Sequence, residues 1–181
     1  PSDHSASGLY KAGFAGDTLN TAYYLRACCP TDWDVGYLTR LGVDTHSEHL
    51  KKFIRELGID MPEIPVHPDR IPGLYMITLD EGERSFSYWR ENSAARSRRE
   101  EPKAVSQAVS TAEVVYLSGI TLAILPPQGR ADLRRSLSKS GARVAFDPNY
   151  RPRLWANPET ARSVFMETAS LCDFVLPSFD D

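Results

Sequence analysis

Apolar residues recur along the chain in two patterns, and these predict which segments are helices and which are strands. Helical patterns run through residues 17–27, 45–57, 129–140 and 158–171. Short continuous apolar runs occupy 114–117, 144–146 and 174–176, with helical patterns between them. Such runs, alternating with helices of about ten residues or more, are typical of parallel βαβ units. The second half therefore predicts an α/β layer with both faces of its sheet covered.

The first half predicts a strand and its exit loop over residues 33–42, placed between the helices at 17–27 and 45–57. Gly16 stands where the backbone must turn into the first of these helices, and Asp17 is predicted as its N-cap. Gly58 closes the second helix, because glycine readily takes the left-handed conformation that follows many helix ends.

A β-hairpin is predicted in the middle of the chain, with strands at 73–79 and 84–90 and a tight glycine-containing turn between them. This register places Tyr75 opposite Tyr88, on a face that Arg90 shares. The aromatic face has two interpretations. Either it packs on the domain core while Arg90 reaches water, or it closes over a bound anion or sugar.

Composition narrows the class of protein. A chain of 181 residues with 41% hydrophobic and 25% charged residues is suited to one folded domain. The formal charge of -3 gives no electrostatic reason to expect nucleic acid or a membrane surface. No apolar run approaches the roughly 18 residues that span a bilayer, and the first residues do not resemble a secretion signal. The odd count of 3 cysteines lacks Cys-x-x-Cys spacing, which favours a reducing, cytoplasmic setting over disulfides or zinc.

Two short polar segments could carry chemistry. Gly16, Asp17 and Asn20 stand at a predicted helix start, where they form either an ordinary cap or a site for ligand hydroxyls. Asp147, Asn149 and Arg151 form a polar Asp-x-Asn-x-Arg cluster just past an apolar strand, at the edge where open α/β sheets bind ligands. The alternative for that segment is a proline-stiffened surface loop.

Some polar residues are interpreted without a function. His46 and His49 share a predicted helix, but no acidic or cysteine partner is spaced to complete a metal site, so both are predicted to be solvated. The charged run 96–101 is predicted as a solvated linker or helix face. The two commonest nucleotide-binding sequence fingerprints are absent from the sequence.

Three segments carry a resemblance: Gly-Phe-Ala-Gly-Asp-Thr-Leu-Asn-Thr-Ala at 13–22, Pro-Gly-Leu-Tyr to Tyr-Trp-Arg at 72–90, and Tyr-Leu-Ser-Gly-Ile-Thr-Leu-Ala-Ile-Leu at 116–125 with Asp-Pro-Asn-Tyr-Arg-Pro-Arg-Leu-Trp at 147–155. In this order they resemble the ribokinase-like (PfkB) carbohydrate kinases. The last two segments resemble the branch that acts on keto-deoxy sugar acids. The resemblance implies a partial three-layer α/β/α sandwich over 1–181, with a small β-sheet lid inserted at about 71–90.

The resemblance also implies a reaction: transfer of the ATP γ-phosphoryl group, with Mg²⁺, to the 6-hydroxyl of 2-keto-3-deoxygluconate. By position, the residues expected to bind this sugar acid are Gly16, Asp17, Asn20, Tyr75, Tyr88, Arg90 and Arg151. Asn149 and Arg151 are expected beside the nucleotide phosphates. Arginine suits both sites, because its guanidinium pairs with carboxylate and phosphate oxygens. Pairing of two copies through the lid is a further expectation.

Departures from the family pattern leave alternatives open. Ala15-Gly16 replaces a Gly-Gly pair, and the chain starts at Pro1 and stops after an apolar run, so we expect a piece of a longer protein. The family's Gly-Ala-Gly-Asp segment, which carries the catalytic base, is expected beyond Asp181, so no base is assigned here. The alternatives are a ribokinase- or fructokinase-type kinase of a neutral sugar, and an inactive sugar-binding fragment.

Overall fold

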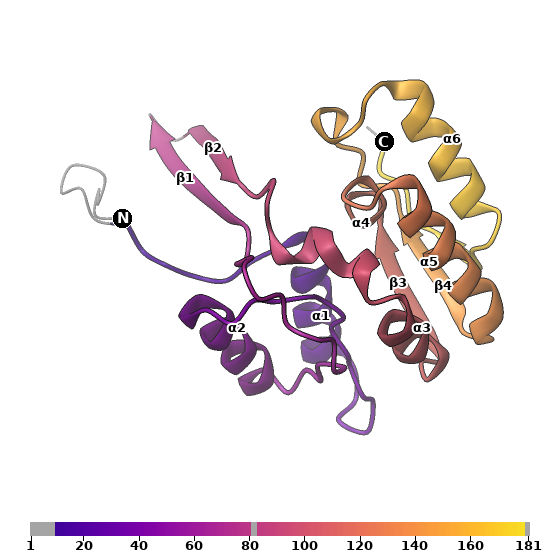
Figure 1. Ribbon diagram of the computed structural model, residues 1–181, viewed down its shortest axis with the longest axis horizontal. Helices are drawn as coiled ribbons and strands as arrows, with labels where there is room; N and C mark the ends of the chain where they lie inside the picture. Colours follow the sequence, from indigo (N-terminus) through magenta and orange to yellow (C-terminus); the bar gives the residue numbers. More distant parts are fainter. Residues whose placement is uncertain (1–9, 81–82, 180–181) are drawn as a thin grey trace.

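The computed structural model describes residues 10–80 and 83–179. Its second half is built on a parallel sheet in the order β3 (Val114–Ser118), β4 (Arg143–Asp147) and β5 (Phe174–Val175). The helices around this sheet are α3 (Pro102–Ser110), the short α4 (Gly119–Ala123), α5 (Pro127–Ser140) and α6 (Pro158–Ala169). The predicted βαβ units of the second half are confirmed (Figure 1).

The two faces of the sheet are covered by different helices. Leu117 and Phe146 are paired neighbours on β3 and β4, and both are buried with side chains of α3, α5 and α6. Tyr116 and Ser118 alternate with Leu117, so they point to the opposite face. Helix α1 (Asp17–Cys28) lies against that face. Helix, sheet and helix are therefore stacked in three layers, as the family resemblance implies.

A second, smaller core lies between α1 and α2 (Thr45–Glu56). Leu19 and Ala22 of α1 pack there with Ile54 of α2. Asp44 caps α2 by accepting from the amide of Ser47 at 3.0 Å. One face of α1 thus joins this core while another faces β3, and α1 connects the two parts of the molecule (Figure 1).

The hairpin of β1 (Leu74–Asp80) and β2 (Glu83–Trp89) projects from the body as a separate arm (Figure 1). Its register is the predicted one, with Tyr75 opposite Tyr88 and Ile77 opposite Phe86. Phe86 and Tyr88 stack with ring centroids 6.1 Å apart, as expected for side chains on one face. Phe86 and Tyr88 are exposed, so the interpretation that this face packs on the domain core is wrong.

Two local predictions are also wrong. Residues 33–42 form no strand; they are joined to the following segment by single parallel bridges at Gly36 and Gly42. Helix α1 is capped by Gly16, and Asp17 is its first residue. For the charged run 96–101, the helix alternative is confirmed, because most of the run lies in the 3₁₀ helix η2 (Ala94–Glu100), where Ser97 is buried.

Candidate functional site

Asp17 is the meeting point of three distant segments. Its Oδ1 accepts a hydrogen bond from Asn149 Nδ2 at 2.5 Å, and its Oδ2 accepts one from Ser118 Oγ. Ser118 is the last residue of β3, and Asn149 lies two residues past the end of β4. The parallel pairing of β3 and β4 brings these ends to the same edge of the sheet. The fold therefore brings Asp17 and Asn149, two of the predicted site residues, into direct contact.

The start of α1 fixes the carboxylate from the other side. Gly16 is extended, and its amide donates to Asn20 Oδ1 at 3.3 Å. The amide of Asn20 in turn donates to the carbonyl of Gly16 at 2.8 Å. Asn20 therefore closes the first helical turn while its side chain remains exposed. This arrangement points Asp17 across to the sheet edge.

The loop after β4 holds Asn149 in an uncommon conformation. Its φ is 36°, in the left-handed region that asparagine tolerates better than most residues. Asp147 Oδ1 accepts the amide of Asn149 at 3.0 Å, which stabilises the turn. Gly119 allows the close approach of this loop, because a Cβ there would lie 1.8 Å from the carbonyl oxygen of Pro148. The small residue at 119 and the turn at 147–149 together place the Asn149 amide.

Burial shapes the electrostatics of this cluster. Burial raises the pKa of Asp17, and hydrogen bonds from Ser118 and Asn149 partly oppose that rise. Burial, with a smaller effect of the neighbouring Asp147, raises the pKa of Tyr116 to about 12. Tyr116 donates to Asp147 Oδ2 at 3.0 Å, so its phenol stays protonated and connects β3 to the end of β4.

Arg151 stands at the exposed side of this cluster. One guanidinium nitrogen donates to the carbonyl of Tyr150 at 3.0 Å, and the side chain is otherwise open to solvent. Its positive charge lowers the pKa of Asp17 slightly, as the smallest of the influences on that carboxyl. An exposed guanidinium beside a carboxylate that hydrogen bonds hold in place is suited to an anionic ligand that also carries hydroxyls.

The hairpin residues form a second group. The Tyr75 and Tyr88 rings lie 6.2 Å apart, and the Arg90 guanidinium lies 4.2 Å from the centre of the Tyr88 ring. This cation–π contact holds the arginine against the ring while leaving its donors available. The hairpin group has the arrangement that the predicted register requires. That the hairpin group and the Asp17 group contact one ligand together stays a prediction.

Sequence reasoning missed two residues of the cluster, Ser118 and Tyr116, whereas Asp147 belongs to the predicted Asp-x-Asn-x-Arg cluster at the end of its strand. Ser118 and Asp147 are equivalent positions, since they are paired and each is the polar last residue of an otherwise apolar strand end. That shared pattern is the signal that could have found Ser118. Tyr116 carried no such signal, because a tyrosine within an apolar strand resembles an ordinary core residue.

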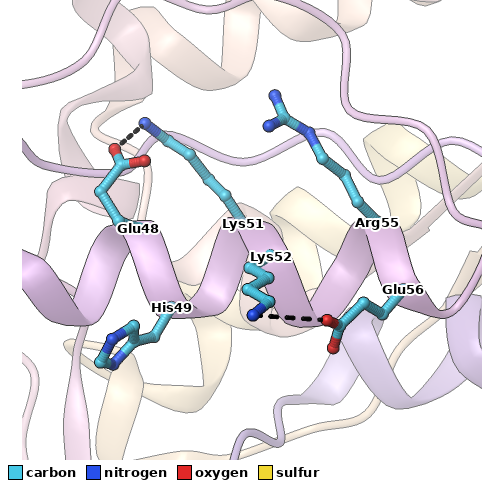
Figure 2. A pocket seen from close by; sticks show the side chains of 6 residues that line it. All are labelled: Glu48, His49, Lys51, Lys52, Arg55 and Glu56. Atoms are coloured by element: carbon cyan, nitrogen blue, oxygen red, sulfur yellow. Dashed lines mark hydrogen bonds and ion pairs between the residues drawn. The ribbon is translucent and has the colours of Figure 1, made fainter.

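A shallow hollow of about 490 Å³ lies elsewhere, on the exposed face of α2. Figure 2 shows its charged side chains, where Glu48 pairs with Lys51 at 2.6 Å and Lys52 with Glu56 at 3.8 Å. His46 and His49 are exposed on this helix, as predicted. Within residues 10–80 and 83–179, no group of three or more metal-ligating side chains is placed to hold an ion. This helix surface is an ion-paired, solvated face.

Comparison with known proteins gives a family match over almost the whole chain. The model of the pfkB family carbohydrate kinases matches residues 2–181. The chain belongs to this family. The 2-dehydro-3-deoxygluconokinase of Dickeya dadantii is 41% identical over 176 residues, which cover 93% of this chain and 57% of that protein. The Haemophilus influenzae protein of the same name is 39% identical, covering 93% and 56%. The chain thus spans less than two thirds of these PfkB relatives.

Solved structures support the ribokinase-like fold. A PfkB protein from Polaromonas sp. JS666 superposes with a TM-score of 0.79 at 25% identity, over 90% of this chain and 55% of that one. The 2-dehydro-3-deoxygluconokinase of Thermotoga maritima superposes with a TM-score of 0.74 at 22% identity, over 90% of this chain and 50% of that one.

In the part of the chain that the structure describes, no helix has the length and apolar character needed to cross a bilayer.

Proposed function

We propose that the protein to which this chain belongs is an ATP-dependent sugar kinase that phosphorylates the 6-hydroxyl of 2-keto-3-deoxygluconate, which is also named 2-dehydro-3-deoxygluconate. The observation that carries the proposal is the bond between Asp17 and Asn149, which joins the start of α1 to the loop after β4. It brings together the two segments that the resemblance assigns to substrate and to phosphate. The names of relatives at 39% and 41% identity support the choice of sugar acid.

Binding of the sugar acid rests on two kinds of side chain. Gly16, Asp17 and Asn20 offer a helix start with a carboxylate and an amide for hydroxyl groups. Arg90 and Arg151 supply positive charge for a carboxylate, with Tyr75 and Tyr88 as ring surfaces on the hairpin. Guanidinium groups favour an acidic sugar over a neutral one.

In the proposed reaction, the 6-oxygen of the sugar bonds to the γ-phosphorus of ATP while the bond from that phosphorus to the β,γ-bridging oxygen breaks. The hydroxyl proton passes to a base that we expect outside these 181 residues. Asn149 and Arg151 orient the phosphates, and Arg151 offsets the negative charge that gathers on their oxygens. Asp17 orients the sugar through its hydroxyls.

The proposed cofactors are ATP and Mg²⁺. The side-chain amide of Asn149 and the exposed guanidinium of Arg151 are donors that fit phosphate oxygens. When bound, Mg²⁺ offsets phosphate charge, and it is commonly held largely by the phosphates themselves. The described residues provide no group of three or more acidic, histidine or cysteine side chains that could hold it without the phosphates.

The deciding experiment assays the full-length protein with ATP and Mg²⁺ on 2-keto-3-deoxygluconate, with fructose and ribose as neutral competitors. We expect kcat/KM to be highest for the acid. Faster turnover of a neutral sugar would favour the fructokinase or ribokinase alternative. Sugar binding by calorimetry with no turnover of any sugar would favour a binding module. The 181-residue chain alone is expected to be inactive, because it holds no assigned base.

Recognition of the carboxylate is tested by Arg90→Ala in the full-length protein. Loss of one charge-assisted hydrogen bond, worth about 1.5 to 3 kcal/mol, should raise KM for the acid more than KM for a neutral analogue. Steady-state kinetics on both substrates measure the difference. Equal changes for both would count against a role of the hairpin in binding the carboxylate.

We also propose that two copies pair through their hairpins and that the protein works in the cytoplasm. Ile77 and Phe86, which lie nearer the hairpin tip than Tyr88, are each more than 40% exposed, and a second hairpin could cover them. Sedimentation of the full-length protein tests this pairing. Phe86→Asp should shift a dimer to monomers, and a monomeric wild type would rule the pairing out.

A further inference from the structure

Arg40 is a buried charge outside the site described above. Only 5% of its side chain is exposed, and all three guanidinium nitrogens donate hydrogen bonds. It lies in the segment that is bridged to its neighbour at Gly36 and Gly42, on the body of the molecule. An arginine is buried at this cost only where its partners are fixed around it. Those partners lie on both sides of the hairpin in the sequence.

The partner before the hairpin is a backbone carbonyl: Arg40 Nε donates to the oxygen of Pro65 at 2.9 Å. After the hairpin, one terminal nitrogen donates to the carbonyl of Ser97 at 2.9 Å and to Glu100 at 2.6 Å. The other terminal nitrogen reaches Glu101 at 3.2 Å. One side chain therefore ties the body to the segments that enter and leave the hairpin.

These contacts continue to the base of the hairpin. The amide of Ala94, at the start of η2, donates to the carbonyl of Ile71 at 3.0 Å and joins the two ends of the arm. Ala94 is fully buried. Next to this bond the backbones at Gly73 and Arg90 approach closely, since a Cβ at Gly73 would lie 2.8 Å from Cβ of Arg90. The position of η2 therefore determines the position of the Arg90 backbone.

The charges around the guanidinium suit a permanent anchor. Its hydrogen bond to Glu100 is the main reason that the pKa of Glu100 lies below its ordinary value. His67 lies 3.9 Å from the same carboxylate, and Arg70 adds positive charge nearby. Arginine fits this place better than lysine, because its planar fork reaches a carbonyl and two carboxylates in different directions at once.

We infer that Arg40 is a positioning residue for the hairpin: it fixes η2 and the segment at Pro65, and thereby directs Tyr75, Tyr88 and Arg90 toward the bound sugar acid. The effect on substrate binding rests on the proposed function. The anchoring of the hairpin base does not, because it follows from the contacts of Arg40 alone.

The test uses the full-length protein with Arg40→Met and Arg40→Lys. Arg40→Lys keeps the charge but cannot hold all the partners, so it serves if Arg40→Met does not fold. Arg134→Met is the matched control, since Arg134 is also a mostly buried arginine and forms an ion pair with Glu167 at 3.0 Å, between α5 and α6. Two readouts are taken: amide hydrogen exchange over residues 71–100, and KM and kcat with 2-keto-3-deoxygluconate and ATP.

We expect both Arg40 variants to exchange the amides of 71–100 faster, by about tenfold for Arg40→Met. KM for the sugar acid should rise by about tenfold while KM for ATP and kcat stay within about twofold. Arg134→Met should change neither readout. Unchanged exchange over 71–100 in the Arg40 variants would overturn the inference. So would faster exchange with an unchanged KM for the acid, because a purely structural residue gives that result.

A wild-type protein that phosphorylates no sugar would end the proposed function, and the exchange data would then decide the anchoring alone. Faster exchange confined to the Arg40 variants would support the anchoring, and equal exchange in all variants would overturn it.

Discussion

At the scale of single residues, the charge of Asp17 lowers the stability of the folded protein, while its carboxylate is proposed to bind the sugar. Its carboxylate is partly buried, and burial raises its pKa, so the ionised form is less favourable in the folded protein than in the unfolded chain. Between the ordinary pKa and the raised one the folded state holds more protons. Stability therefore falls as pH rises through that range, and the ionised carboxylate lowers stability at neutral pH.

Asp17→Asn should separate these two effects. The amide removes the buried charge and can still accept from Asn149 and bond to Ser118, so the melting temperature at pH 7 should be equal to or above that of the wild type. KM for the sugar should rise by about tenfold or more, because a charge-assisted hydrogen bond is lost. Thermal melts and steady-state kinetics measure the two effects. A clear drop in melting temperature would contradict this account of Asp17.

Tyr116 predicts a pH effect in the alkaline range. The folded protein keeps the phenol proton up to about pH 12, whereas the unfolded chain loses it near 10.0. In that interval the folded state binds more protons, so the stability that Tyr116 contributes is complete below pH 10 and is lost as pH rises toward 12.

Tyr116→Phe should be less stable than the wild type by about 1 kcal/mol at pH 8, where it lacks the hydrogen bond to Asp147. This difference should shrink above pH 10. Urea unfolding of both proteins at pH 8, 10 and 11 tests it, and a difference that does not change with pH would be evidence against the raised pKa.

At the scale of elements, the junction of β3 and α4 depends on a residue without a side chain. Gly119→Ala would place a methyl group against the carbonyl of Pro148 and the ring of Phe165. The loop 147–149 must then move away, and Asn149 with it. We expect a loss of about 1 to 3 kcal/mol in the free energy of unfolding, together with weaker substrate binding.

Gly13→Ala is the control for this substitution, since a Cβ at Gly13 would meet nothing within 4 Å. Its free energy of unfolding should stay within about 0.5 kcal/mol of the wild type. Chemical denaturation measures both variants. Equal stabilities of the two variants would show that the loop tolerates a side chain at 119.

At the scale of the whole molecule, the sheet has an open side. β3 pairs with β4, and among the described residues no strand pairs with its other edge, which faces a groove of about 730 Å³ between α1, α3 and α5. Leu25 and Val114 line that groove and are more than 40% exposed. Unpaired strand edges with apolar neighbours promote association between chains.

The 181-residue chain by itself should therefore associate as its concentration rises, and Val114→Lys should reduce this association by adding charge at the edge. Light scattering over a concentration series measures it. Thr111→Lys serves as a control for added charge, since Thr111 is an exposed groove residue outside β3. Association that is equally reduced by both variants would assign the effect to net charge and not to the edge.

Prediction from sequence worked best where a pattern is local. The hairpin register followed from period-2 alternation around a short turn. The position of α2 followed from helical spacing, and the prediction that Gly58 closes this helix is confirmed by its left-handed φ of 70°. Prediction worked least well at residues 33–42. An extended segment becomes a strand only when neighbours pair along its length, and here only Gly36 and Gly42 form bridges.

The sequence by itself determined the βαβ alternation of the second half, the face of the hairpin that carries Tyr75 and Tyr88, and the family. These depend on short-range periodicity and on motifs that are read directly. Only the tertiary structure decided that Ser118 and Asn149 hold Asp17, and that Arg40 reaches Pro65 and Glu101. Such contacts join residues far apart in the chain, because parallel strands bring their carboxyl ends to one edge and buried charges need partners wherever the fold provides them.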